Sequence, residues 1–287
     1  MIIDFLRRNW QLKVKHHADP TFIKGLEWCE EIVEPAIKNF LENHDLKQFL
    51  DSIKDFDEWA FKLNYQPPQK SNWLNTGQNK AYPYITETIW SAIFAVICEK
   101  LNKATNSNEF KLIQGDNMPN FRCNTCGDSH KAVDTGIYIE KNGTKFPVIY
   151  AECKNGHACK TCHEGIWGQG IRLKQSFPNA IQMFVTDNNI SIKDELPESY
   201  WNSGIDMEIQ QRGLPGQKWK TKDVKEKGIH YELNHKTIAK TMNHILEGVA
   251  GRSVSHWTKQ NVSSSEVSSF AGKIKSQGYY IKPGLFD

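Results

Sequence analysis

The sequence lacks a long apolar run. Its most apolar stretch, residues 88–98, is far shorter than the roughly 20 residues that a membrane-spanning helix needs. The first ten residues already contain Asp4, Arg7 and Arg8, whereas a secretory signal peptide continues into an apolar core. We therefore expect a soluble, cytoplasmic protein that makes no membrane contact.

Strong charge bias, repeats and low-complexity tracts are also missing. The formal net charge is only +3 over 287 residues, and 39% of the residues are hydrophobic. These values exclude a disordered or repeat protein and favour one large α/β domain, or a core domain with an appended module. The positive charge is concentrated in residues 201–287, where 13 Lys and Arg face 8 Asp and Glu. That excess suits either a phosphate-binding segment or an ordinary solvated surface.

Cysteine is scarce and odd in number. Four of the seven cysteines form two Cys-x-x-Cys pairs about thirty residues apart. Without an export signal, such pairs favour metal binding over disulfides. The candidate zinc ligands are Cys123, Cys126, Cys159 and Cys162.

The pattern of apolar residues predicts mixed α and β structure. Helical spacing occupies residues 20–63, 84–103 and 234–247, and residues 178–188 form a buried strand. Residues 195–230 are irregular and polar in this interpretation, which places a boundary between a core of residues 1–195 and a C-terminal region of residues 196–287. We expect a mixed β-sheet flanked by helices.

Residues 133–154 read as a β-hairpin whose second strand ends in Glu152-Cys153-Lys154. Side chains alternate along a strand, so Glu152 and Lys154 share one face and Cys153 points into the core behind it. An acid and a lysine side by side at a strand end suit a charged ligand, although a solvent-exposed Glu/Lys pair is the plainer alternative.

The turn decides whether Asp134 joins Glu152. A two-residue turn at Asn142 and Gly143, with no bulge, places Asp134 opposite Ala151 on the other face. A three-residue bulged turn, or a bulge elsewhere in the hairpin, brings Asp134 onto the face of Glu152. We expect one of the bulged registers.

The sequence "VD", a hairpin and "AECK" resembles the PD-(D/E)XK nuclease superfamily, and within it type II restriction endonucleases of the EcoRI-like group. The resemblance covers about a quarter of the chain and implies a restriction-endonuclease-like core. It implies that Asp134 and Glu152 bind Mg²⁺, with the Cys153 carbonyl completing the site. Lys154 would position or activate the attacking water, and Glu87 is the candidate for an additional acid. The sequence reads Ala-Val-Asp at residues 132–134, so valine stands directly before Asp134 where the family often has proline.

The two Cys-x-x-Cys pairs lie just outside the two open ends of this hairpin, which are adjacent in space. A structural Cys₄ zinc ion there would clamp the hairpin, and four thiolates would leave no open position for catalysis. A histidine could replace one cysteine, and the candidates are His130, His157 and His163.

The resemblance implies a Mg²⁺-dependent, site-specific endonuclease of a prokaryotic cell that acts on double-stranded DNA as a homodimer or as paired subunits. Residues 165–179 and 208–220 are candidate base-reading loops. The tail, residues 253–284, weakly resembles a winged helix. Two alternatives stay open: a repair or junction nuclease of the same superfamily, and a non-catalytic zinc-dependent DNA-binding protein.

Overall fold

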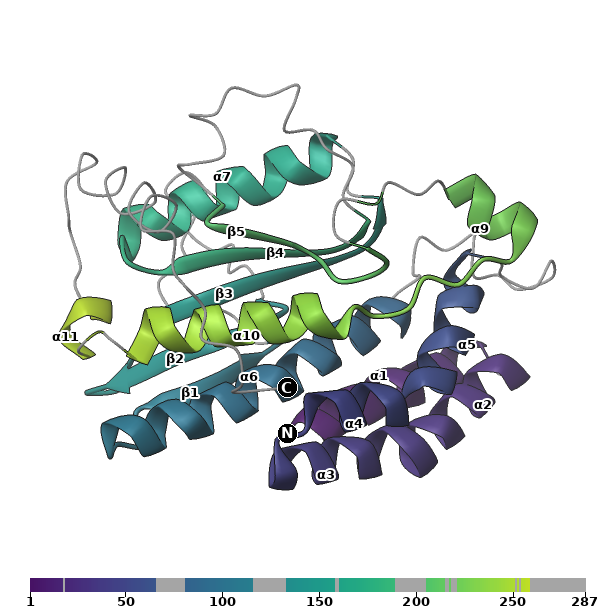
Figure 1. Ribbon diagram of the computed structural model, residues 1–287, viewed down its shortest axis with the longest axis horizontal. Helices are drawn as coiled ribbons and strands as arrows, with labels where there is room; N and C mark the ends of the chain where they lie inside the picture. Colours follow the sequence, from purple (N-terminus) through teal and green to yellow (C-terminus); the bar gives the residue numbers. More distant parts are fainter. Residues whose placement is uncertain are drawn as a thin grey trace.

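The computed structural model describes residues 1–17, 19–65, 81–115, 133–157, 160–188, 205–214, 217, 221–250, 252 and 254–258. Five strands form one mixed sheet in the order β1-β2-β3-β4-β5 (Figure 1). The strands are β1 (Phe110–Gln114), β2 (Thr135–Lys141), β3 (Thr144–His157), β4 (Ile181–Asn188) and β5 (Met207–Gln210). The first three strands pair antiparallel, whereas β4 and β5 join β3 in parallel. The expected α/β class with a mixed sheet flanked by helices is therefore confirmed.

Helices cover both faces of the sheet. The elements are α1 (Ile2–His17), α2 (Pro20–Trp28), the π-helix η1 (Cys29–Val33), α3 (Glu34–Asn43), α4 (Leu46–Ser52), α5 (Lys54–Tyr65), α6 (Ala81–Thr105), α7 (Lys160–Ser176), α9 (Thr221–Lys227), α10 (His235–Ala250) and α11 (Val254–Trp257). Figure 1 shows α6 and α10 on one side of the sheet and α7 on the other, with α1–α5 forming a helical layer beyond α6.

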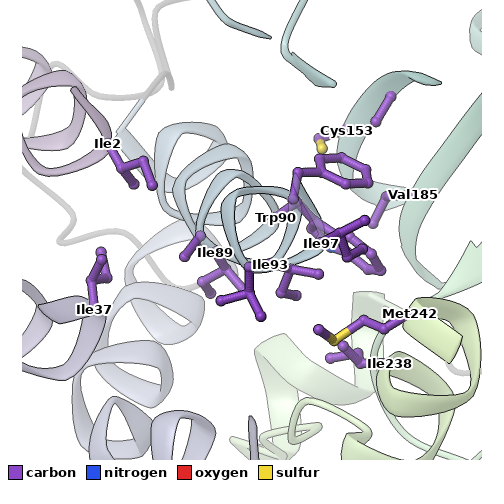
Figure 2. Close-up of a cluster of buried hydrophobic side chains, with 14 of the residues drawn as sticks. Ile2, Ile37, Ile89, Trp90, Ile93, Ile97, Cys153, Val185, Ile238 and Met242 are labelled. Carbon is purple, nitrogen blue, oxygen red and sulfur yellow. The ribbon is translucent and has the colours of Figure 1, made fainter. Parts of the chain in front are cut away.

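The main core lies between the sheet and α6. Trp90, Ile93 and Ile97 of α6 are fully buried and meet Val185 of β4 and Met242 of α10 (Figure 2). This helix is apolar nearly all round because it is enclosed by the sheet, α10 and the N-terminal helices. On the other face, Tyr150 packs against residues in and just after α7. The sheet is thus buried on both sides, as expected for strands with continuous apolar runs.

The hairpin between β2 and β3 has a two-residue turn. Lys141 pairs with Thr144, and the turn residues Asn142 and Gly143 have φ values of 52° and 73°. Positive φ at both positions is the geometry of a type I′ turn. The expected three-residue bulged turn is therefore wrong, because Asn-Gly adopts this tighter conformation at low steric cost.

A bulge occurs further along the same hairpin. Ile137 pairs with Ile149 while Tyr138 pairs with Pro147, so Val148 is an extra residue on β3. The shift makes Thr135 pair with Ala151, and the register continued by one residue places Asp134 beside Glu152. The alternative of a bulge elsewhere in the hairpin is therefore confirmed.

Other expectations need correction. The strand β1 is absent from the predicted elements, because five residues are too short for a clear pattern. The segment 195–230 is not wholly irregular, because β5 and α9 lie within it and β5 belongs to the same sheet. The strand expected at residues 178–188 and the helix expected at residues 234–247 are present as β4 and α10. In the described residues, no helix combines the length and apolarity required to cross a bilayer.

Candidate functional site

The ends of several elements meet at one edge of the sheet. Strands β3, β4 and β5 are parallel, so their C-terminal ends lie at the same edge, where polar residues replace apolar ones. The side-chain amide of Asn102 bonds to the backbone of Phe110, so α6 ends where β1 begins. Since β1 runs in the same direction as β3, its first residue lies at the opposite edge of the sheet, and α6 therefore starts near the polar edge. The edge therefore brings together the start of α6, the start of β2 and the end of β3.

Asp134, Glu152 and Lys154 lie together at this edge. The Lys154 Nζ is 2.9 Å from the Glu152 Oε1. The Asp134 Oδ2 accepts a hydrogen bond of 2.8 Å from the backbone N–H of Cys153, which ties the start of β2 to the residue between the acid and the lysine. Glu152 is buried, with 5% of its side chain exposed, whereas the side chain of Lys154 is 39% exposed. The group is thus held inside the sheet and reaches solvent at the lysine.

The face assignments from strand alternation are confirmed. Tyr150 lies two residues before Glu152 on the α7 side and donates a hydrogen bond of 3.4 Å to the Glu152 Oε2. Cys153 lies in the main core on the α6 side (Figure 2). Cys29, Cys98 and Cys153 are buried free thiols.

Negative charge dominates this group. Burial disfavours the charged form of Lys154, but the charges of Glu152 and Asp134 outweigh burial and raise the pKa of its ammonium. Burial, followed by the same two carboxylates, raises the pKa of the Tyr150 phenol. Two carboxylates facing one ammonium leave a net negative charge, and this donor set suits a hard cation.

Glu87 lies in the early part of α6 and is buried at 8% exposure. Burial raises the pKa of the Cys153 thiol, and the charges of Asp134, Glu87 and Glu152 raise it further, so all three acids act on one atom. Nevertheless, the described residues contain no group of three or more His, Cys, Asp or Glu side chains close enough to hold a metal ion. Glu87, Asp134 and Glu152 thus share Cys153 as a neighbour, but the described side chains form no three-ligand group there.

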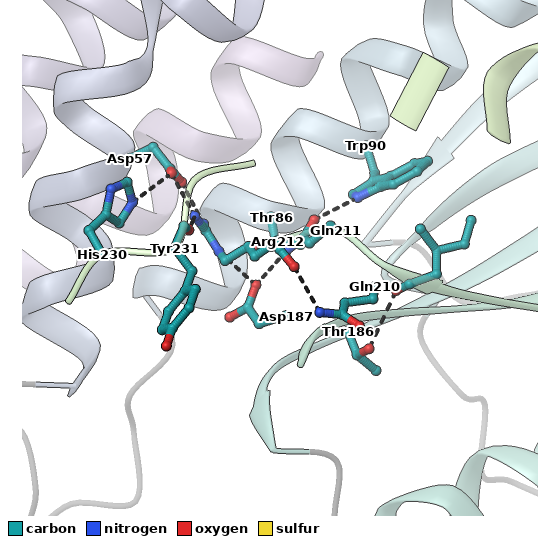
Figure 3. Close-up of polar contacts among 11 residues, drawn as sticks. Asp57, Thr86, Trp90, Thr186, Asp187, Gln210, Gln211, Arg212, His230 and Tyr231 are labelled. Carbon is teal, nitrogen blue, oxygen red and sulfur yellow. Dashed lines mark hydrogen bonds and ion pairs between the residues drawn. The ribbon is translucent and has the colours of Figure 1, made fainter. Parts of the chain in front are cut away.

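A second polar cluster beyond the same edge was not expected from the sequence (Figure 3). The guanidinium of Arg212 is fully buried. It donates to both carboxylate oxygens of Asp57 at 2.6 and 2.7 Å, to Asp187 at 2.9 Å and to the Tyr231 carbonyl at 3.1 Å. Gln211 bonds to Asp187, and its carbonyl accepts from the Trp90 indole at 3.0 Å. This cluster ties α5 and α6 to the ends of β4 and β5.

This cluster overturns one set of candidate base-reading residues. Gln210, Gln211 and Arg212 are 7%, 0% and 0% exposed, so they bond within the protein and cannot reach the edges of DNA bases. The basic residues that follow belong partly to α9, where Lys222 and Lys227 pair with Glu226 and Asp223 one turn away. That arrangement is typical of a solvated helix surface.

The other candidate segment, residues 165–179, is largely the helix α7 and not a loop. Its Lys174 is buried against Asp206, with the Nζ and Oδ1 atoms 2.5 Å apart and both side chains 1% exposed. Asp206 also accepts from the backbone N–H of Gln182 at 2.7 Å. Lys174 therefore anchors α7 to the sheet and is unavailable to DNA.

The zinc prediction falls mostly outside the described residues. Cys123, Cys126 and Cys159 are not among them, and of Cys162 only the backbone is described, within α7. The histidine candidates for substitution and most of the tail that suggested a winged helix lie outside the described side chains as well.

The chain matches no known family model and no curated protein sequence. Assignment of its function therefore depends on its own residues and their geometry.

Proposed function

We propose that this chain is a Mg²⁺-dependent endonuclease of the PD-(D/E)XK type that hydrolyses phosphodiester bonds of double-stranded DNA. The observation that carries the proposal is that Asp134, directly before β2, accepts a hydrogen bond of 2.8 Å from the Cys153 N–H on β3, between Glu152 and Lys154, whose side chains lie 2.9 Å apart. Two acids and a lysine, the residue types that this chemistry requires, thus lie together at a sheet edge where Lys154 reaches solvent.

The residues fit a magnesium ion. Mg²⁺ in nucleic-acid enzymes is held by one or two carboxylates, and water and phosphate oxygens fill the remaining positions. Asp134 and Glu152 supply two carboxylates, and Glu87 adds negative charge nearby. A cluster of three protein ligands is not required for this ion. When bound, the metal would polarise the scissile phosphate and lower the pKa of a coordinated water.

The protein's own groups have distinct roles in this proposal. The Cys153 N–H fixes the Asp134 carboxylate, and the Tyr150 hydroxyl fixes the carboxylate of Glu152 from the other side. Lys154 holds its ammonium at the solvent end of the group, where it would orient the attacking water and stabilise negative charge on the phosphate.

We further propose that the enzyme is a site-specific type II restriction endonuclease with structural zinc on the four cysteines. Cleavage of both strands requires two active sites, which implies a homodimer or paired subunits. Restriction-type cleavage would give discrete fragments from plasmid DNA, whereas a repair or junction nuclease would cut according to DNA structure.

The test is cleavage of plasmid DNA by purified protein with and without Mg²⁺. We expect Mg²⁺-dependent cleavage that falls at least 100-fold in Glu152→Gln and in Lys154→Met, in line with the loss of a transition-state contact of about 3 kcal/mol. Glu140→Gln is the matched control, because Glu140 is an exposed acid on the same hairpin, at its far end.

Circular dichroism and thermal melting would establish that the variants are folded. The proposal fails if the wild type cuts no DNA with Mg²⁺, or if folded Glu152→Gln cuts as fast as the wild type. Binding of DNA without any cleavage would support the non-catalytic zinc-dependent alternative instead.

A further inference from the structure

The first helix contacts the polar sheet edge through Phe5. The Phe5 ring meets the Tyr84 ring of α6 edge-on, with the ring centroids 5.8 Å apart. The same ring packs so closely on Gly115 that an added Cβ there would lie 2.6 Å from Phe5. Gly115 also has a positive φ of 61°, which favours glycine independently. Phe5 is thus wedged between the start of α6 and the end of β1.

The residues that contact Phe5 are close in the chain, or hydrogen-bonded, to the segments with the candidate catalytic acids. The backbone N–H of Gly115 donates to the carbonyls of Val133 and Asp134 at 2.9 and 3.2 Å. Tyr84 lies three residues before Glu87 on α6. The N-terminal helix therefore packs beside the segments that carry both Asp134 and Glu87.

Arg8 is the cation that α1 places at this position. Its guanidinium carbon lies 5.8 Å from the centroid of the Phe5 ring, and its side chain is exposed. Within the described part of the chain, no carboxylate is within ion-pair distance of Arg8. Its neighbour Arg7 differs, since it points to α3 and η1 and pairs with Glu34 and Glu30.

Charge connects Arg8 with the acids. Burial raises the pKa of the Tyr84 phenol; the charge of Glu87 raises it further and that of Arg8 lowers it, so both charges reach this hydroxyl. A surface rich in carboxylates repels the phosphate backbone, and a DNA-cutting enzyme needs exposed cations beside its acids to hold DNA in register. An exposed guanidinium suits this task because its fork of donors matches phosphate oxygens.

We infer that Arg8 binds a backbone phosphate of the DNA substrate beside the scissile bond, with the Phe5 ring holding its side chain in place. The inference rests on the proposed nuclease function and extends its substrate-binding surface to α1. Arg8 would be a DNA-contacting residue that leaves the chemistry itself to the carboxylates and Lys154.

The test is the salt dependence of binding to a fluorescent DNA duplex, measured by anisotropy without added divalent metal so that the DNA stays intact. Loss of one phosphate contact in Arg8→Gln should make the slope of log K against log salt less negative by about 0.9. Over a fourfold rise in salt concentration, the ratio of the wild-type association constant to that of Arg8→Gln should then fall roughly 3–4-fold. Arg8→Lys should keep most of the slope because it retains the charge.

Lys103→Gln is the matched control, since this exposed lysine lies in the last turn of the same helix that carries Glu87, at the opposite end of the sheet. Its slope should equal that of the wild type. If the wild type binds and cuts DNA but Arg8→Gln shows an unchanged slope, the inference about Arg8 is overturned and the nuclease function stands. If the wild type binds no duplex at all, both fall.

Discussion

Replacing Arg212 by methionine should strongly destabilise the fold. The guanidinium is enclosed, with four hydrogen bonds of 2.6 to 3.1 Å to two carboxylates and a carbonyl, and it lies 4.9 Å from the centroid of the Phe61 ring. Methionine would fill much of the space of the arginine stem but would leave Asp57 and Asp187 buried without their cation. Breaking a buried ion pair from one side costs about 3–5 kcal/mol.

The loss should be read from urea unfolding followed by tryptophan fluorescence. A drop of this size corresponds to a fall in melting temperature of roughly 5–8 °C for a chain of this length. Lys54→Met is the comparison, because Lys54 pairs with Glu232 at 2.8 Å on the surface, where both side chains are more than half exposed. That pair should contribute about 0–1 kcal/mol.

The pH dependence gives the prediction a sign. In the wild type, burial acts to raise the pKa of Asp57, but Arg212, with a smaller contribution from His230, overcomes burial and the pKa lies below its ordinary value. The corresponding stability is present above the ordinary pKa of about 3.9 and is lost as the pH falls through the lowered value. In Arg212→Met burial should prevail and raise this pKa, so the variant should gain stability as the pH falls.

The difference in unfolding free energy between wild type and Arg212→Met should therefore be largest near neutral pH and narrow toward pH 4. A loss at neutral pH no greater than that of Lys54→Met would refute the view that Arg212 neutralises the buried carboxylates. So would a difference that does not change with pH.

Three further predictions concern the thiols, the site tyrosine and zinc. In the native protein Cys29, Cys98 and Cys153 should resist alkylation far more than in urea, because burial raises the pKa of all three thiols, to about 12 for Cys29 and Cys98; peptide mapping that finds them modified in the native state would contradict this. Tyr150→Phe should lower the unfolding free energy by about 1–2 kcal/mol, since the buried Glu152 carboxylate loses a donor, and an unchanged urea midpoint would count against that bond. Metal analysis should find one zinc per chain, and its removal by a chelator should lower the melting temperature, whereas well under one zinc per chain would remove the basis for the four-cysteine site.

Local sequence patterns predicted the faces of the β3 strand at the candidate site better than they predicted the hairpin register. Alternation along residues 148–154 separated Glu152 and Lys154 from Cys153, because side chains on a strand must alternate whatever the rest of the fold does. The position of Asp134 depended on a bulge at Val148, which no turn residue signals. The Asn-Gly turn instead adopted its own preferred geometry.

The polar segments misled for a related reason. Gln210, Gln211 and Arg212 look like a surface loop in sequence, since polarity alone does not distinguish a solvated side chain from one that is buried and bonded. Their partners Asp57 and Trp90 lie more than a hundred residues away, and no local pattern reveals such contacts.

The sequence by itself determined the α/β class, the apolar helices and strands, and the faces of the β3 strand, because periodicity and side-chain alternation are local properties. Only the tertiary structure decided that Asp134 lies beside Glu152, that Lys174 and Arg212 are enclosed, and that Arg8 is exposed beside the start of α6. These outcomes depend on strand register and on contacts between segments that are distant in sequence. Because burying an unpaired charge is costly, a buried charge requires a partner that only the tertiary structure supplies.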